Sequence, residues 1–111
     1  MTEFIQVTTA IDSQAKAQQL AELLVKQRLA ACVHVSGPIT STYWWQGEIE
    51  VAEEWICSVK TLYACYPEVE AAIKRWHSYE EPEIVALPLL TGSTSYLDWI
   101  RRETREPEQS E

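Results

Sequence analysis

The order of the predicted elements indicates an α+β fold of the ferredoxin-like sandwich type, β-α-β-β-α-β with an added C-terminal helix. Three observations predict it: a short β-type run opens the chain, two stretches carry apolar residues at helical spacing, and a long β-rich hairpin lies between them. The 111 residues have the length of one ordinary domain, expected here over residues 1–104. Residues 105–111 are polar and acidic, and we expect them to form a flexible tail.

The first half of the pattern is a strand followed by an amphipathic helix. In the run "EFIQVTT" the side chains alternate between two sides, as they do in a strand. The helix is expected from Ser13, which can cap it, to about Leu29. Its buried stripe is formed by residues at helical spacing: Ala17, Leu20, Ala21 and Leu24.

The second half has a helix followed by a strand. Pro67 suits the first turn of the helix, which must end around residues 77–79 because Pro82 excludes helical geometry from its predecessor. Its expected buried stripe is Val69, Ala72, Ile73 and Trp76. The run "EIVALPL" is the next strand, with Pro88 at an edge or a bulge, and "YLDWIRRET" is the terminal helix.

The hairpin between the two halves is too long for a chain of this size. A break is expected at "GPI", and the arms "TSTYWW" and "EIEVAEEWICSVKT" then flank a tight turn that contains Gly47. The second arm, Glu48 to Lys60, would be about 40 Å long at ~3.3 Å per residue. A globule of this length is only about 26 Å across in gyration terms. Part of the hairpin is therefore expected to project past its own core and pair with another chain.

The charge balance and the apolar pattern narrow the class of partner. Asp and Glu outnumber Lys and Arg by 17 to 9, for a formal net charge of −8, so nucleic acid is an unfavourable ligand and cationic partners are favoured. No apolar run approaches the ~20 residues that span a bilayer, so no membrane association is expected. The N-terminal residues lack the pattern of a secretory signal, and a cytoplasmic location is expected.

Cysteine and glycine usage argues against both a disulfide framework and an enzyme. Cys32, Cys57 and Cys65 are odd in number and form no C-x-x-C pair, so we expect small reduced hydrophobic residues. With only three glycines there is no glycine-rich phosphate loop, and no G-x-S-x-G elbow or obvious nucleophile and base pair occurs. The protein is therefore not expected to be an enzyme.

Two histidines are candidate metal ligands. His77 lies at a helix end and is followed by Glu80, Glu81 and Glu83, and imidazole with carboxylates can bind divalent copper or zinc. The alternative is a polar helix cap in which Tyr79 and Glu80 tie the loop to the sheet. Cys32 and His34 are two residues apart in a predicted strand, but two ligands do not make a site, and a buried thiol with a hydrogen-bonded imidazole is favoured there.

Two charged residues of the second arm have open roles. Glu53 is the only charge on the strand side formed by Ile49, Val51 and Trp55. It is either buried and paired, or it lies on an overhang and faces water or another subunit. Lys60 either neutralises an acidic pocket or solvates the end of the strand.

Several segments together resemble the CutA, or divalent-cation-tolerance, proteins. They are "TTAIDSQAKAQQLAELL", "LAACV", "STYWWQGEIEVAEEW", "VKT", "HSYEEPEI" and "LPLLTGSTSYLDWI", in this order along the chain. The resemblance implies a ferredoxin-like subunit assembled through its long hairpins into a tight homotrimer, similar in architecture to PII-like signalling proteins. It also implies binding of divalent metal ions, chiefly Cu²⁺, and a role in their tolerance.

The resemblance carries over to individual positions. At the metal-site positions of some relatives, a cysteine and two adjacent histidines, this chain has Thr8, Trp76 and His77. Only His77 is retained, so a metal would have to recruit Glu80, water or a neighbouring subunit. The candidates for an inter-subunit pocket are Tyr43, Trp45, Glu53, Lys60, Tyr79, Tyr96 and Trp99. The alternative function is a PII-like sensor or scaffold that binds a small ligand at subunit junctions without catalysis.

Overall fold

The computed structural model describes residues 2–107, and it has the predicted ferredoxin-like α+β architecture. The strands are β1 (Phe4–Ile11), β2 (Cys32–Trp45), β3 (Glu48–Leu62) and β4 (Val85–Pro88). The helices are α1 (Gln14–Lys26), α2 (Tyr66–Trp76), which follows a short 3-10 turn, and α3 (Thr94–Glu103). The strands form one antiparallel sheet in the order β2-β3-β1-β4.

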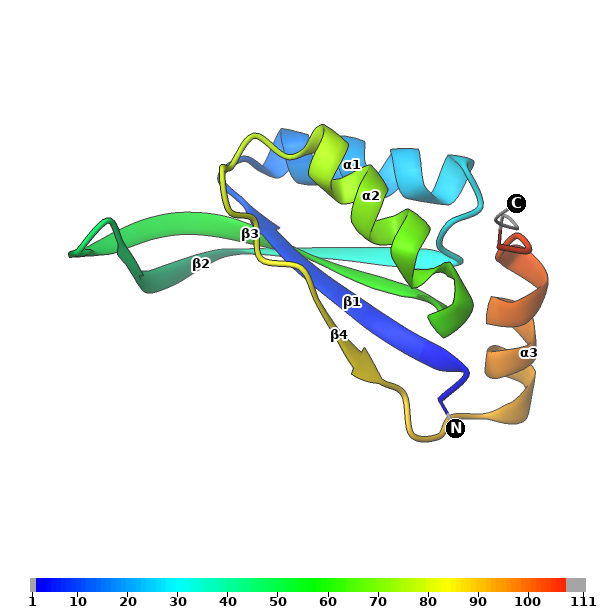
Figure 1. The fold of residues 1–111 in the computed structure, drawn as a ribbon. Helices are drawn as coiled ribbons and strands as arrows, with labels where there is room; N and C mark the ends of the chain where they lie inside the picture. Colours follow the sequence, from blue (N-terminus) through cyan, green and yellow to red (C-terminus); the bar gives the residue numbers. More distant parts are fainter. Residues whose placement is uncertain (1, 108–111) are drawn as a thin grey trace.

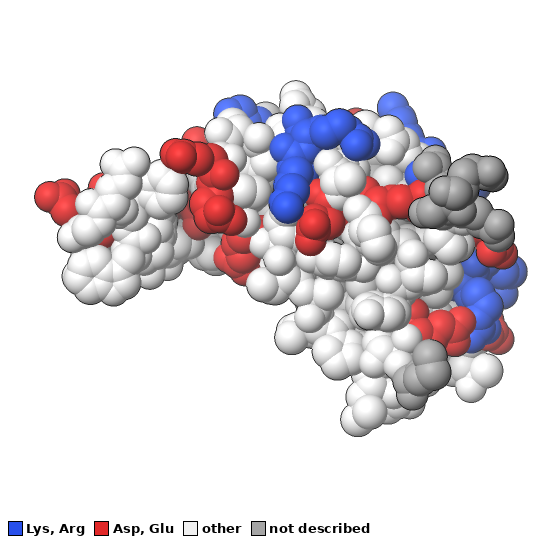
Figure 2. All heavy atoms as spheres, in the orientation of Figure 1, with Lys and Arg blue, Asp and Glu red and all other residues white. Residues whose placement is uncertain are grey.

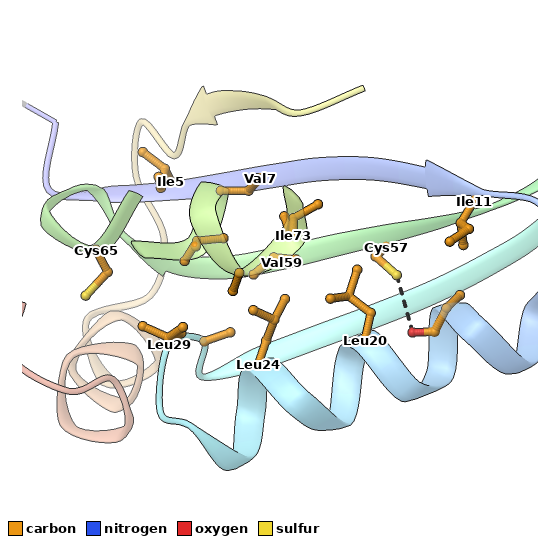
Figure 3. Packing of buried hydrophobic residues seen from close by; sticks show 14 residues of the cluster. Ile5, Val7, Ile11, Leu20, Leu24, Leu29, Cys57, Val59, Cys65 and Ile73 are labelled. Atoms are coloured by element: carbon orange, nitrogen blue, oxygen red, sulfur yellow. Dashed lines mark hydrogen bonds between the residues drawn. The ribbon is translucent and has the colours of Figure 1, made fainter. Parts of the chain in front are cut away.

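Helices α1 and α2 lie on one face of the sheet, and α3 lies at one end of it (Figure 1). Alternation along the strands turns Val7 and Ile11 of β1, and Cys57 and Val59 of β3, toward these helices. They pack against Leu20 and other fully buried residues of the helices (Figure 3). The fold thus has a single core on the helical face, and no helix covers the opposite face of the sheet within the described residues.

Helix α1 ends three residues before the predicted end at Leu29. Its start is as expected, because the Ser13 side chain accepts a hydrogen bond from the backbone N–H of Lys16. Its end is set by Arg28, which has a left-handed backbone (φ 60°), and the Leu29 amide closes the turn onto the Leu24 carbonyl. Leu29 is therefore buried as part of the chain that turns back to the sheet.

The predicted break at "GPI" is wrong, because β2 continues through it. The pairing of β2 with β3 shifts register between Ser36 and Ile39, which makes the segment a β-bulge. Gly37 lies against the Trp55 ring, and an added Cβ atom would be only 2.6 Å from a ring carbon. The bulge therefore requires a residue without a side chain at this position.

The long hairpin extends beyond the core, as the sequence predicts. Strand β3 has 15 residues, of which only the second half pairs with β1, and the tight turn has positive φ at Gln46 and Gly47. In Figure 1 the tip of β2 and β3 projects away from the helices. One side of the projection is apolar and exposed: Trp44 at 72%, Ile49 at 60% and Val51 at 64%.

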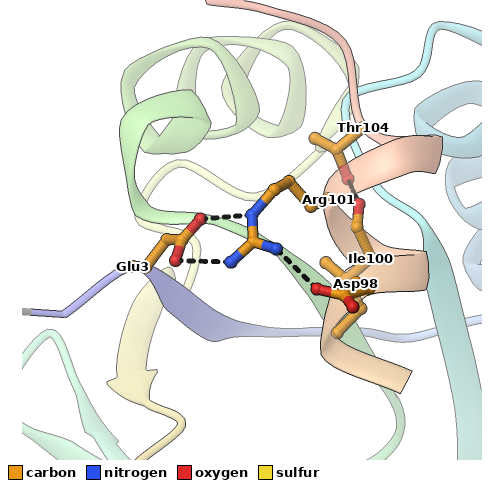
Figure 4. Close-up of polar contacts among 5 residues, drawn as sticks. All are labelled: Glu3, Asp98, Ile100, Arg101 and Thr104. Carbon is orange, nitrogen blue, oxygen red and sulfur yellow. Dashed lines mark hydrogen bonds and ion pairs between the residues drawn. The ribbon is translucent and has the colours of Figure 1, made fainter. Parts of the chain in front are cut away.

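Helix α3 is fastened to the start of β1 by one arginine. Arg101 donates two hydrogen bonds to the Glu3 carboxylate at 2.8 and 2.9 Å, and a third to Asp98 on its own helix at 2.7 Å (Figure 4). Its guanidinium also lies 5.2 Å from the centre of the Phe4 ring. Ile100, which belongs to α3, is fully buried.

No helix among the described residues is both long and apolar enough to span a membrane.

The predicted tail at 105–111 begins at a residue with several contacts. The Arg105 amide donates to the Arg28 carbonyl at 2.8 Å, and the Arg105 guanidinium lies 3.5 Å from a Glu68 oxygen. Residues 108–111, the rest of the predicted tail, lie outside the described residues. Cys57 and Cys65 are buried free thiols, as predicted, whereas Cys32 is partly exposed.

Candidate ligand cavity beside the hairpin

A cavity of about 870 Å³ lies where the hairpin leaves the body of the protein. Its walls come from three segments: the end of β1, the hairpin residues 41–45 with Ala52 and Glu54, and the loop residues 79–83. Five carboxylate residues line it: Asp12, Glu54, Glu80, Glu81 and Glu83. Figure 2 shows acidic side chains gathered at this junction on the face in view.

The aromatic wall of the cavity comes mainly from one side of the hairpin. In the β2–β3 register Ser41 is opposite Ala52 and Ile39 is opposite Glu54, so alternation places Tyr43 and Trp45 on the same side as Glu54. Tyr79 completes the wall from the loop after α2. The cavity therefore combines aromatic surface with negative charge.

Glu54 and Tyr79 join the hairpin to the loop. The Tyr79 hydroxyl donates to Glu54 Oε2 at 2.7 Å, and Glu54 is only 6% exposed. Burial, followed by the hydrogen bond to Glu54 and its charge, raises the pKa of Tyr79 well above its ordinary value of 10.0. The phenol therefore keeps its proton and remains a hydrogen-bond donor throughout the physiological pH range.

His77 joins the same loop to β1 and is 8% exposed. Its Nε2 lies 2.7 Å from the Ala10 carbonyl oxygen, and its Nδ1 lies 3.1 Å from the Tyr79 amide nitrogen. A carbonyl can only accept and an amide N–H can only donate, so the ring is neutral with its proton on Nε2. Binding a metal at either nitrogen would break one of these hydrogen bonds.

The described residues of one chain do not supply a closed metal site. Among residues 2–107 no group of three or more His, Cys, Asp or Glu side chains is arranged to hold a metal ion. Cys32 Sγ and His34 Nε2 lie 3.7 Å apart, but two ligands are too few for a closed metal site. Glu80 is exposed to solvent. An ion at His77 and Glu80 would have to take its other ligands from water or a second subunit.

The structure separates the predicted pocket residues into two groups. Tyr43, Trp45 and Tyr79 lie together around the cavity, which the candidate metal ligand Glu80 also lines. The others lie elsewhere: Glu53 is exposed on the opposite side of the hairpin, and the Lys60 ammonium donates to Gln6 Oε1 at 3.3 Å on the uncovered face of the sheet. Tyr96 and Trp99 stack on each other in α3, with 5.5 Å between the centres of their rings. Of the two roles predicted for Glu53, the structure of one chain therefore agrees with an exposed position on the overhanging part of the hairpin.

The sequence reasoning missed Glu54, the buried carboxylate of the cavity. The apolar pattern of the arm singles out the strand side that contains Glu53, whereas Glu54 points to the other side. The available signal was the alternation itself, because Ala52 and Glu54 share a side with Tyr43 and Trp45 across the hairpin. The contact with Tyr79 links residues 25 apart and depends on the path of the loop.

Comparison with known proteins gives one consistent result. Residues 5–103 match the family described as CutA1 divalent ion tolerance protein. The divalent-cation tolerance protein CutA of Thermus thermophilus is 41% identical over 104 residues, which cover 94% of this chain and 99% of that protein. The crystal structure of CutA1 from Oryza sativa superposes with a TM-score of 0.92 at 31% identity, covering 95% of this chain and 96% of that chain. A solved structure from Archaeoglobus fulgidus, described as a periplasmic divalent cation tolerance protein CutA, has a TM-score of 0.84 at 40% identity, with 93% and 98% coverage.

Proposed function

The chain belongs to the CutA1 divalent ion tolerance family, and from this premise we propose that it is a cytoplasmic homotrimer that binds divalent cations, Cu²⁺ foremost, without catalysing a reaction. The observation that carries the proposal is the cavity, which is large enough for a ligand and is lined by five carboxylates and by the loop that His77 anchors. Carboxylates raise the local concentration of cations, and the net charge of −8 acts in the same direction. The link to metal tolerance rests on the family.

The ligands proposed for the ion are His77 and Glu80. Imidazole and carboxylate are suitable donors for Cu²⁺, and Glu80 is exposed in the loop that His77 anchors. Because His77 is hydrogen bonded through both nitrogens, binding would release one of these bonds and move the loop. The remaining ligands would come from water or from a neighbouring subunit.

The exposed apolar side of the hairpin is the basis for proposing a homotrimer. Trp44, Ile49 and Val51 form an exposed apolar side on a projecting two-stranded ribbon, and such a surface is typical of a subunit contact. The sheet also has an uncovered face, and the strand β4 at its edge exposes Val85 and Leu87. Assembly would cover these surfaces and could bring a second subunit toward the cavity.

Calorimetric titration of the purified full chain with Cu²⁺ tests the metal proposal. We expect saturable binding in the wild type, and about tenfold weaker binding in Glu80→Gln, which removes one charged ligand at an exposed position. His77→Ala should weaken binding further, with circular dichroism as the check that the variant is folded. His34→Ala is the matched control, because it removes the other histidine of the chain and should bind as the wild type does.

Two outcomes would contradict the proposed ligands. Binding that is unchanged in both Glu80→Gln and folded His77→Ala would exclude these residues, and binding lost equally in His34→Ala would move the site to Cys32 and His34. The proposed location has its own test in fractionation of the producing cells. Recovery outside the cytoplasm, in the manner of the relative described as periplasmic, would overturn it.

A further inference from the structure

We propose that the cavity beside the hairpin binds a small organic cation, one that carries a protonated or quaternary alkylammonium group. This goes beyond the binding of metal ions proposed above. It rests on three features of the cavity: a buried carboxylate that lacks a counter-charge, an aromatic wall, and a size that suits an organic molecule.

Glu54 is the carboxylate that has no counter-charge among the described residues. It is more than nine-tenths buried, and among residues 2–107 no lysine, arginine or histidine forms an ion pair with it. Its hydrogen bond comes from the neutral Tyr79 hydroxyl, and it leaves most of the acceptor capacity of a carboxylate unused. Buried charges in proteins are normally paired, so this position calls for a cation from outside the chain.

The other charged residues that line the cavity also favour a cation. Asp12, Glu80, Glu81 and Glu83 add four carboxylates, and none of the described lining residues is Lys, Arg or His. An anionic ligand would meet repulsion on every side, and a neutral ligand would leave Glu54 without a counter-charge. The charge of the cavity therefore selects a cation.

The aromatic side chains select the kind of cation. Tyr43 and Trp45 line the cavity from the hairpin and Tyr79 lines it from the loop. Aromatic rings attract alkylammonium groups through their faces and can bury the alkyl carbon atoms. The aromatic wall therefore favours a cation that carries alkyl groups.

The size of the cavity fits the same class. The cavity is partly open to solvent, and its volume of about 870 Å³ lies in the range of small-molecule sites. The site also joins three separate segments through the Tyr79–Glu54 and His77–Ala10 hydrogen bonds. A bound ligand would therefore hold the hairpin and the loop together and stabilise the fold by mass action.

The test compares choline with its uncharged isostere 3,3-dimethylbutan-1-ol, by calorimetry and thermal unfolding of the full chain at constant ionic strength. We expect saturable binding of choline and a rise in the melting temperature, and at least about tenfold weaker binding of the isostere. Glu54→Gln keeps an acceptor for Tyr79 but removes the charge, and should weaken choline binding by about tenfold or more.

Two further variants complete the test. Trp45→Leu, at a partly exposed position of the hairpin, removes an aromatic ring and should also weaken choline binding. Glu22→Gln removes one negative charge from the exposed side of α1 and should leave it unchanged. Equal binding of choline and the isostere, or choline binding that is unchanged in both Glu54→Gln and Trp45→Leu, would overturn the proposal.

A wild-type protein that binds no choline would also overturn it. The copper titration provides a separate readout. Loss of metal binding in Glu80→Gln leaves the choline result standing, and failure of the choline titration leaves the metal proposal standing.

Discussion

The thiol of Cys57 is fully buried on the core side of β3, where it donates to the Ala17 carbonyl of α1 at 3.5 Å (Figure 3). Burial raises its pKa from 9.0 to about 11, because the thiolate would have to form away from water. In the unfolded chain the thiol loses its proton near pH 9. Its contribution to stability is therefore complete below pH 9 and is lost as the pH rises through about 11.

This linkage predicts a change in alkaline stability. The free energy of unfolding should fall between pH 9 and pH 11, with about 2 to 3 kcal/mol attributable to Cys57. Urea unfolding at a series of pH values checks this in the wild type and in Cys57→Ala. The alanine variant should be less stable at pH 7 but should have a flatter profile above pH 9, and a parallel profile would contradict the assignment.

Single residues also show where sequence reasoning reaches its limit. The resemblance pointed to Tyr43, Trp45 and Tyr79, and these do lie around one cavity. It could not reveal that both nitrogens of His77 are occupied by backbone groups, since Ala10 is 67 residues away in the chain. Glu54 was missed for a similar reason, because a carboxylate is identified as buried only once the loop that covers it is placed.

At the scale of the elements, α3 depends on its ionic contact with the start of the chain. Arg101 holds Glu3 through two hydrogen bonds, and its pKa is raised mainly by this contact. The same contact lowers the pKa of Glu3. The groups are exposed to solvent, so their effect is expected in the local opening of the helix more than in global stability.

Hydrogen exchange should therefore detect the loss of this contact. In Arg101→Gln the amides of α3 should exchange about threefold or more faster than in the wild type, while those of α1 and α2 remain unchanged. High salt should produce part of the same effect in the wild type. Arg102→Gln, on the adjacent exposed position of the same helix, is the control and should leave exchange in α3 as it is.

The elements themselves could largely be predicted from hydrophobic periodicity and from capping and breaking residues. Ser13 and Pro67 mark the starts of the first two helices within one residue, and Pro88 lies on an edge strand as predicted. The errors come from tertiary context. The left-handed Arg28 ends α1 early, and the bulge at Gly37 places that residue against the Trp55 ring, where a side chain would not fit.

At the scale of the whole molecule, the length of the hairpin is the feature of the sequence that best predicts the overall shape. The prediction that β3 extends past its own core needed only the rise per residue and the size of the globule. The described residues have extents of 43 × 35 × 27 Å, with the hairpin as the projecting part. The number of chains in the proposed assembly is beyond such an estimate, because it would depend on the angle at which one ribbon meets the next.

The proposed trimer predicts a mass in solution. Light scattering at micromolar concentration should give about 38 kDa, three times the 12.7 kDa of one chain. Val51→Lys places a charge on the exposed apolar side of the hairpin and should shift the mass toward 12.7 kDa or cause loss of soluble protein. Arg102→Glu, on the exposed side of α3, should keep the wild-type mass. A wild-type mass of one chain would contradict the trimer.

The position of Trp44 near the turn of the hairpin has an optical consequence. In a lone chain its indole is in water, and its emission should lie at long wavelength. If assembly buries the apolar side of the hairpin, the emission shifts toward the blue, and dilution below the dissociation constant should reverse the shift. The tip of the ribbon thus carries an intrinsic reporter of assembly, readable as the difference in emission between the wild type and Trp44→Phe, because the chain has four other tryptophans.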